Sequence, residues 1–160
     1  EGTTLTVRLN LPIVDQQPVT KQEGHLEDDD VRGLHLLVAE DNELNWEVIE
    51  ILLEEFGVTC ERVENGRLCI EQLLANPAGT YDAILMDVQM PEMNGLEASQ
   101  RIRNLDEAAL RNIPVIDMTE DAFAEDVQAC ISSGMNGHMA KPIDTIVLLN
   151  YLKKIKNKMF

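Results

Sequence analysis

The chain opens with a stretch in which apolar and polar residues alternate, and a polar stretch follows it. Between positions 3 and 11, one face carries Thr3, Leu5, Val7, Leu9 and Leu11. Strict alternation of this kind predicts a half-buried strand. Residues 14–32 are polar and acidic, which is typical of a linker.

From Gly33 onward, short apolar runs alternate with segments whose apolar residues recur every three or four positions. The apolar runs predict strands at 34–39, 58–63, 81–87, 113–119 and 135–140. The intervening segments predict helices at 43–56, from Asn65 to near Pro77, at 96–105, at 122–133 and from Asp144 through Ile155. Five such units predict one α/β domain over residues 33–160, with a doubly wound five-stranded parallel sheet and helices on both faces.

The first of these helices has its apolar residues at steps of four. They are Leu44, Val48, Leu52 and Phe56, and Gly57 follows them. The spacing predicts the apolar face of the helix, and the glycine predicts its end.

Composition narrows the range of partners. The chain has 160 residues and a net charge of −16. Because nucleic acids and anionic membranes are also negative, we expect contact with neither, and we expect cations or basic protein surfaces instead. No apolar run approaches the ~20 residues of a membrane span, and no signal-peptide pattern opens the chain. The three cysteines, Cys60, Cys69 and Cys130, lack metal-ligand spacing, so we expect reduced core thiols in a cytoplasmic protein.

Polar residues follow the predicted strands at the edge where ligands bind in doubly wound sheets. Glu40 and Asp41 follow the first strand, Asp87 ends the third, Thr119 ends the fourth, and Lys141 follows the fifth. Three carboxylates in one pocket need a counter-ion, and oxygen ligands with water suit Mg²⁺. The sequence therefore predicts a magnesium site.

The same edge also favours an anion. Lys141 and the Thr119 hydroxyl would both stabilise a bound anion, and an anion beside Mg²⁺ indicates phosphoryl chemistry. A carboxylate can itself be the nucleophile and form an acyl phosphate.

Four stretches of the chain resemble the motifs of the response-regulator receiver domain. They are VAEDNELN, ILMDVQMPEMNG, IPVIDMT and GMNGHMAKPI, in the order and on the elements that the family requires. The resemblance covers roughly residues 33–158 and is nearest to receivers fused to hybrid sensor histidine kinases. The opening EGTTLTVRLNLP is similar to the last strand of a histidine-kinase ATP-binding domain, so residues 1–13 are expected to be the remnant of one. The parent chain is then expected to be a histidine kinase, anchored in a membrane or not, of which this fragment is the phosphoacceptor.

The resemblance implies a role for each residue of the acidic edge. Asp87 would be the phosphoacceptor. Glu40 and Asp41 would hold Mg²⁺, with Asp41 the more direct ligand, and the backbone carbonyl of Gln89 would complete the protein's share. Lys141 would bind a phosphoryl oxygen and the Asp87 carboxylate, and the bond from Lys141 to the following proline would be cis.

The resemblance also identifies a pair of switch residues and two positions at which this chain differs from the family's usual residue types. Thr119 would hydrogen-bond the phosphoryl group after transfer, and His138 stands where the family usually has a switch aromatic residue. Asp117 stands where the family commonly has a small or apolar residue, and Glu120 where it prefers Ala or Gly. Because alternation puts Asp117 on the same side of its strand as Thr119, we expect both acids to add negative charge near the phosphoryl pocket.

The resulting hypothesis is a receiver that accepts a phosphoryl group from phosphohistidine onto Asp87. The donor and acceptor partners would be the phosphohistidine domain of a histidine kinase or a histidine phosphotransfer protein. The partner face would lie around His138, on the helix at 122–133, the strand at 135–140 and the helix after Asp144.

Two alternatives remain open from the sequence. One is a pseudo-receiver that acts without phosphorylation as a docking or dimerisation module, with a homodimer as its assembly. The other is an aspartyl-phosphate hydrolase, which would want a second acid where Gln89 stands.

Overall fold

A computed structural model describes residues 30–120 and 124–160. The predicted strand at 3–11, the proposed kinase remnant and most of the acidic linker lie outside the described residues. Val31 is buried in the core, so the packed domain includes a residue two positions before the predicted boundary at residue 33. Within the described part of the chain, no helix is long and apolar enough to cross a membrane.

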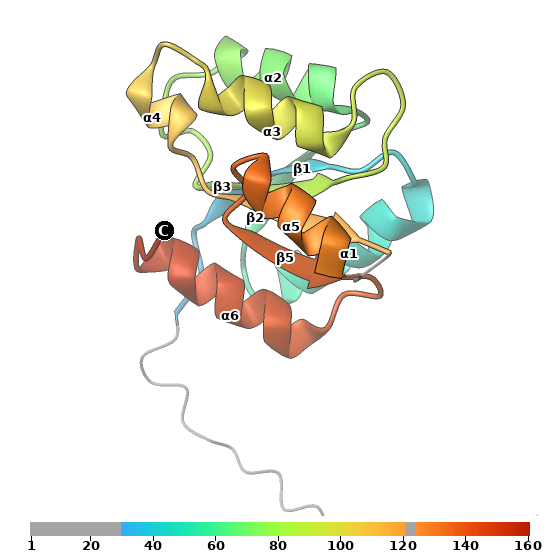
Figure 1. Ribbon diagram of the computed structural model, residues 1–160. Coiled ribbons are helices and arrows are strands. Elements are labelled where there is room, and N and C mark those ends of the chain that lie inside the picture. The colour runs from blue at the N-terminus through green and yellow to red at the C-terminus, as the bar shows by residue number, and fades with distance from the viewer. Residues whose placement is uncertain (1–29, 121–123) are drawn as a thin grey trace, which may run out of the picture.

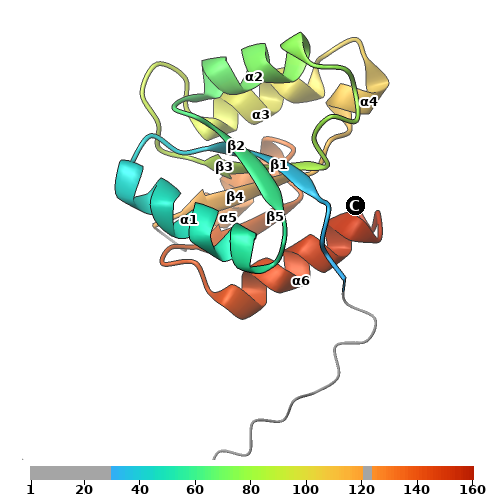
Figure 2. The ribbon, with the colours of Figure 1, turned by 180° about the vertical axis from the view of Figure 1, so that it is seen from behind.

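The centre of the domain is a parallel sheet of five strands, as predicted (Figures 1 and 2). The strands are β1 (His35–Ala39), β2 (Thr59–Val63), β3 (Ala83–Asp87), β4 (Val115–Thr119) and β5 (Gly137–Ala140). They lie in the order β2-β1-β3-β4-β5, so the chain reverses its direction of winding after β2. This reversal places β1 and β3, whose ends carry the predicted acids, side by side.

The described residues form six helices, five between the strands and one after the last strand. They are α1 (Glu43–Glu55), α2 (Gly66–Ala75), α3 (Gly95–Arg103), α4 (Ala108–Arg111), α5 (Ala124–Ser132) and α6 (Thr145–Lys156). Side chains of Asn42, Asn65, Asn94 and Asp144 accept hydrogen bonds from the first turns of α1, α2, α3 and α6, which fixes where these helices begin. The short helix α4 was not predicted.

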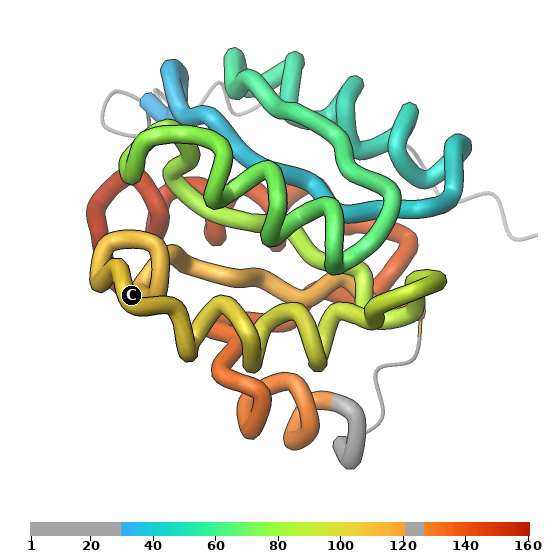
Figure 3. The backbone as a smooth tube through the Cα atoms, turned by 90° about the horizontal axis from the view of Figure 1, so that it is seen from above, coloured from blue at the N-terminus to red at the C-terminus, as the bar shows by residue number. Residues whose placement is uncertain are grey.

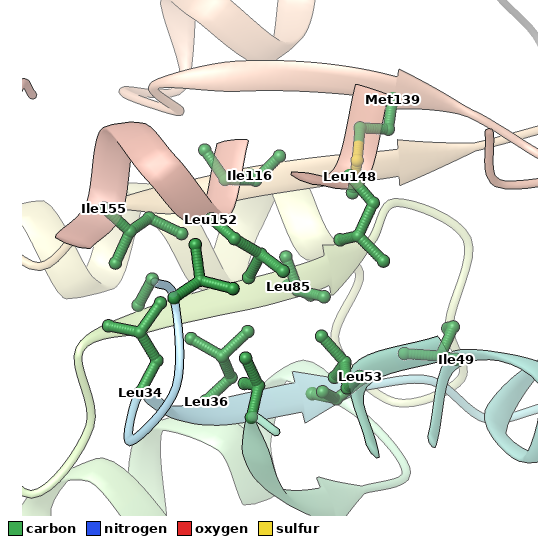
Figure 4. Packing of buried hydrophobic residues seen from close by; sticks show 14 of the residues in the cluster. Leu34, Leu36, Ile49, Leu53, Leu85, Ile116, Met139, Leu148, Leu152 and Ile155 are labelled. Carbon is green, nitrogen blue, oxygen red and sulfur yellow. The ribbon is translucent and has the colours of Figure 1, made fainter. Parts of the chain in front are cut away.

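The helices form a layer on each side of the sheet. On one side α1 and α6 bury a cluster that includes Leu36, Ile49, Leu85, Ile116 and Leu152 (Figure 4). On the other side the buried cluster draws residues from α2, α3, α4 and α5, and α2 and α3 run side by side over the strands (Figure 3). The three central strands β1, β3 and β4 have buried residues facing both layers, which explains their mostly apolar sequences.

The predicted apolar face of α1 is wrong in one respect. Ile49 and Leu53 are the buried residues of this helix, whereas Leu44 is 72% exposed and Val48 is 53% exposed. A helix turns about 100° per residue, so three steps of four residues drift by about 120° around the axis. Phe56, at the far end of this series, therefore packs against the core while Leu44 faces solvent.

The cysteines are core thiols, as expected, and none of them forms a disulfide. Burial, with a smaller contribution from Glu50 and Glu54, raises the pKa of Cys60 to about 11. Burial alone raises the pKa of Cys69 to about 12. Thiolate is the reactive form, so these two thiols are inert at neutral pH.

Candidate phosphoryl and metal site

The structure brings the strand-end residues to one edge of the sheet. Asp87 is the last residue of β3 and Thr119 the last of β4. Glu40 and Asp41 follow β1 directly. One carboxylate oxygen from each of Glu40, Asp41 and Asp87 lies within 4.8 Å of the other two. The backbone N–H of Lys141, after β5, donates to the Thr119 carbonyl at 2.7 Å. Parallel pairing thus places all five residues together.

Lys141 is the cation that joins two of the three acids. Its Nζ lies 2.6 Å from Oε2 of Glu40 and 2.6 Å from Oδ2 of Asp87. Burial acts to lower the Lys141 pKa, but the hydrogen bonds and charges of Asp87 and Glu40 outweigh burial and raise it. The ammonium therefore stays charged, and it offsets part of the negative charge. The bond from Lys141 to Pro142 is cis, as expected.

Glu40 and Asp41 differ sharply in their surroundings. Glu40 is fully buried, and its second oxygen accepts from the Asn42 N–H at 3.2 Å and from Asn45 Nδ2 at 3.0 Å. Both of its oxygens are therefore engaged by protein donors. Asp41 is exposed to solvent. Of the pair, Asp41 has the carboxylate that is more accessible to a metal ion.

Arg62, at the end of β2, holds the loop that carries these two acids. Its Nε donates to the Glu40 carbonyl at 3.0 Å and its Nη2 donates to the Asp41 carbonyl at 3.1 Å. The same guanidinium pairs with Glu43 and lies 6.0 Å from the centre of the Trp46 ring. Sequence reasoning missed this residue. The available signal was a basic side chain near the end of the strand that neighbours β1.

Asp87 is almost completely buried. Burial raises its pKa, and Glu40 raises it further, while Lys141 and the Gln89 N–H offset part of this rise. That N–H donates to Oδ1 of Asp87 at 3.0 Å. Behind Asp87, a Cβ on Gly95 would lie 2.2 Å from the Asp87 carbonyl oxygen, so only glycine permits this close approach of α3.

The acids line a cleft of about 130 Å³ that is open to solvent. Its walls are Glu40, Asp41, Asn42, Asn45, Asp87, Gln89 and Glu120. A larger hollow of about 320 Å³ lies elsewhere, beside residues such as Tyr81, Pro114 and Phe160. The larger hollow has no group of carboxylates, and so the acidic cleft is the candidate site.

The two departures from the receiver pattern fall in different places. Glu120 lines the cleft and is exposed, so it does add negative charge there. The expectation that Asp117 points toward the acidic cluster is wrong. Its Oδ2 lies 2.6 Å from Nδ1 of His138 and accepts from the Cys130 thiol at 3.1 Å, under α5. Alternation predicted the correct face of β4, but a cross-strand partner holds the side chain away from the cleft.

Comparison with known proteins points in the same direction as the geometry. Residues 36–153 match the response regulator receiver domain family. The chain is 34% identical over 128 residues to Probable histidine kinase 6 of Oryza sativa subsp. japonica, and 37% identical over 125 residues to the sensory/regulatory protein RpfC of Xanthomonas campestris pv. campestris. The matches cover 70% and 76% of this chain but 13% and 16% of those proteins, so the chain spans a small part of these relatives.

Solved structures give the same result. The receiver domain of the sensor histidine kinase PA1611 from Pseudomonas aeruginosa PAO1 is 33% identical, with a TM-score of 0.69, and the match covers 78% of this chain and 98% of that chain. That structure has a magnesium ion coordinated in its active site cleft. The signal receiver domain of a histidine kinase from Syntrophus aciditrophicus is 31% identical, with a TM-score of 0.68, over 78% of this chain and 90% of that chain.

The raised pKa of Asp87 predicts a pH-dependent cost to stability in metal-free buffer. The folded state holds the Asp87 proton more tightly than the unfolded chain does, so ionised Asp87 lowers the free energy of unfolding above the folded pKa. This cost disappears as the pH falls through the folded pKa toward the unfolded value of about 3.9. We expect Asp87→Asn to be more stable than the wild type at pH 7 and equal to it near pH 4.

Urea unfolding with a chelator present measures this difference. Asp106→Asn is the matched control, because Asp106 is an exposed acid outside the cleft. A variant at Asp87 that is no more stable than the wild type at pH 7 would contradict the prediction.

Proposed function

Because the chain belongs to the response regulator receiver domain family of two-component signalling, we propose that Asp87 accepts a phosphoryl group from a phosphohistidine, with Mg²⁺ bound beside it, and passes the group to a histidine phosphotransfer protein. The observation that carries the proposal is the position of Lys141. Its ammonium lies 2.6 Å from both Asp87 and Glu40 at the cleft, where it supports an ionised nucleophile and attracts a phosphoryl anion.

The proposed reaction is a transfer between two side chains. A carboxylate oxygen of Asp87 forms the new P–O bond, the P–N bond to the donor histidine breaks, and its electron pair returns to the imidazole. Lys141 neutralises charge on the acyl phosphate. To the Thr119 hydroxyl, at the buried end of β4, we assign the hydrogen bond to the transferred group. Transfer onward is the same exchange in reverse, with a second histidine as acceptor.

The donor set of the cleft fits a magnesium ion. Asp41 and Asp87 are the side-chain ligands we propose, with the Gln89 carbonyl as the backbone ligand, because Asp41 is exposed and Asp87 partly accessible at the cleft, whereas Glu40 is 0% exposed. Hard oxygen donors with room for water are the environment that Mg²⁺ prefers. When bound, the ion would neutralise the charge that gathers on the phosphoryl oxygens. The magnesium in the cleft of the PA1611 receiver supports this assignment.

An apolar rim beside the cleft suggests where the phosphohistidine domain docks. The rim consists of exposed residues of α1 and of the start of α6, namely Leu44, Val48, Ile51, Ile146 and Val147. Between these helices a small hollow is lined by Val48, Pro142 and Ile143 and reaches Lys141. We therefore place the docking surface on this rim, next to the cleft, rather than on the face around His138 that the sequence suggested.

The pseudo-receiver alternative gains no support from the geometry. Asp117, one of its two motives, lies outside the cleft. The hydrolase alternative lacks its second acid, since Gln89 occupies that position in the cleft wall.

Phosphorylation at Asp87 is tested with acetyl phosphate, Mg²⁺ and intact mass spectrometry. We expect the wild type to gain one phosphoryl group and Asp87→Asn to gain none, because the acceptor oxygen is gone. A wild type that stays unmodified, or an Asp87→Asn variant that is still modified, would contradict the proposal.

The same assay tests the charge added by Glu120. A residual repulsion of ~1 kcal/mol between its carboxylate and an incoming phosphate corresponds to about a fivefold change in rate. We expect Glu120→Ala to be phosphorylated several-fold faster than the wild type, with a smaller gain at high salt. An unchanged rate at both salt concentrations would mean that Glu120 has no influence on the donor.

The difference between Glu40 and Asp41 predicts unequal effects on metal binding. Asp41→Asn should weaken Mg²⁺ binding about tenfold more than Glu40→Gln, a difference of ~1.4 kcal/mol. Trp46 fluorescence is a suitable readout, because Arg62 links its ring to the backbone of both acids. Equal titrations for the two variants would contradict the assignment of Asp41 as the direct ligand.

If the rim is the docking surface, its loss should slow phosphorylation by a protein phosphodonor but not by a small-molecule phosphodonor. Replacing both Leu44 and Val48 by Ala should slow transfer from a phosphorylated histidine phosphotransfer protein by about tenfold. The reason is that apolar contact worth ~1.5 kcal/mol or more is lost on docking. Phosphorylation by acetyl phosphate should stay unchanged. Leu74→Ala is the control, since Leu74 is a comparably exposed leucine on α2. Equal slowing with both donors would place the effect in the cleft rather than on the rim.

A further inference from the structure

A buried carboxylate joins three elements of the domain outside the cleft. Asp117 of β4 is 0% exposed. Its Oδ2 lies 2.6 Å from Nδ1 of His138, its partner across the β4–β5 register, and accepts from the Cys130 thiol of α5 at 3.1 Å. With Nδ1 as the donor, Oδ2 of Asp117 accepts both hydrogen bonds. One oxygen atom thereby ties β4 to β5 and to α5.

His138 is also held through its backbone. β5 is an edge strand, and on its open edge the His138 N–H donates to the Tyr151 hydroxyl at 3.0 Å. The same hydroxyl donates to the His138 carbonyl at 3.1 Å. Tyr151 lies directly against the strand, since a Cβ on Gly137 would be 2.4 Å from its ring. The histidine is therefore held by β4 and α6 directly, and by α5 through Asp117.

The hydrogen bond with the imidazole is the stronger of the two that Oδ2 of Asp117 makes, because a thiol is a weak donor. Oδ1 of Asp117 and Nε2 of His138 are buried and have no hydrogen-bond partner among the described residues. If the imidazole swung out to solvent, Asp117 would keep only the weak thiol donor in a buried position. A buried polar group that loses its hydrogen-bond partner is unfavourable, so the ring is held inward.

We propose that Asp117 is a positioning residue that keeps His138, and with it the face formed by β4, α5 and β5, in one arrangement whether or not Asp87 carries a phosphoryl group. This inference rests on the proposed function and specifies it further. The domain signals by handing on its phosphoryl group at the cleft, and it does not signal by reshaping the face around His138.

The experiment uses NMR of the 160-residue chain with Mg²⁺ and beryllium fluoride, which adds to a carboxylate as a phosphoryl mimic. In the wild type we expect amide shifts at Asp87, Thr119 and Lys141 on adding the mimic. The ring nitrogens of His138 and the amides of α5 should keep their positions, and the Nδ1 proton of His138 should exchange slowly with water.

Substitutions at Asp117 separate positioning from general stability. In Asp117→Ala the slow Nδ1 proton should be lost, and the shifts caused by the mimic should spread into β5 and α5. Asp117→Asn keeps an acceptor oxygen and should restore the wild-type pattern. Asp106→Ala, which removes an exposed acid, is the control and should also match the wild type.

Three outcomes count against the inference. Wild-type shifts at Asp87 that extend with equal size to His138 and α5 overturn it while leaving the proposed function intact. A folded Asp117→Ala that keeps the slow Nδ1 proton and the wild-type pattern also overturns it. No shift at Asp87 in the wild type overturns the proposed function and this inference together. If Asp117→Ala does not fold, the wild type and Asp117→Asn still decide the question.

Discussion

The gathering of three carboxylates at one edge of the sheet is the constraint on which the site depends. Glu40 and Asp87 are buried, and like charges at this range in a low dielectric repel strongly. The Lys141 ammonium, 2.6 Å from each, makes the arrangement tolerable. Lys141 reaches them only because β5 pairs with β4, and β4 with β3. The order of the strands is therefore a condition for the chemistry as well as a property of the fold.

The sequence predicted which residues meet at this edge of the sheet where topology alone decides their position. In a parallel sheet the carboxyl ends of all strands meet at one edge, so a residue at a strand end can be placed without knowledge of side-chain packing. Glu40, Asp87 and Lys141 are such residues. Longer helices were equally predictable, because their apolar periodicity persists over several turns. The four residues of α4 are too few to show a period.

Prediction failed where a side chain's direction depends on a partner distant in sequence. Asp117 lies on the face that alternation assigned, yet His138, 21 positions later, determines where its carboxylate points. Arg62 was missed for the same reason, because its acceptors are backbone carbonyls of another strand's loop. The exposure of Leu44 reflects geometry rather than partners, since a step of four overshoots the helical turn.

The two sides of the cleft differ in how firmly they are held, and this difference bears on how the domain works. On the α1 side, apolar residues such as Leu44 and Val48 remain exposed beside the acids, although burying them would be favourable. Apolar surface left open next to a reactive group favours a partner that covers it during transfer. On the β5 side, Asp117 and Tyr151 fix His138 through both its ring and its backbone. A domain with an open, apolar approach to the proposed phosphoacceptor and a firmly held opposite face is suited to repeated docking and transfer. It is poorly suited to carrying a signal through a change of shape, because a movement of His138 would first have to break its hydrogen bonds with the buried Asp117 and with Tyr151.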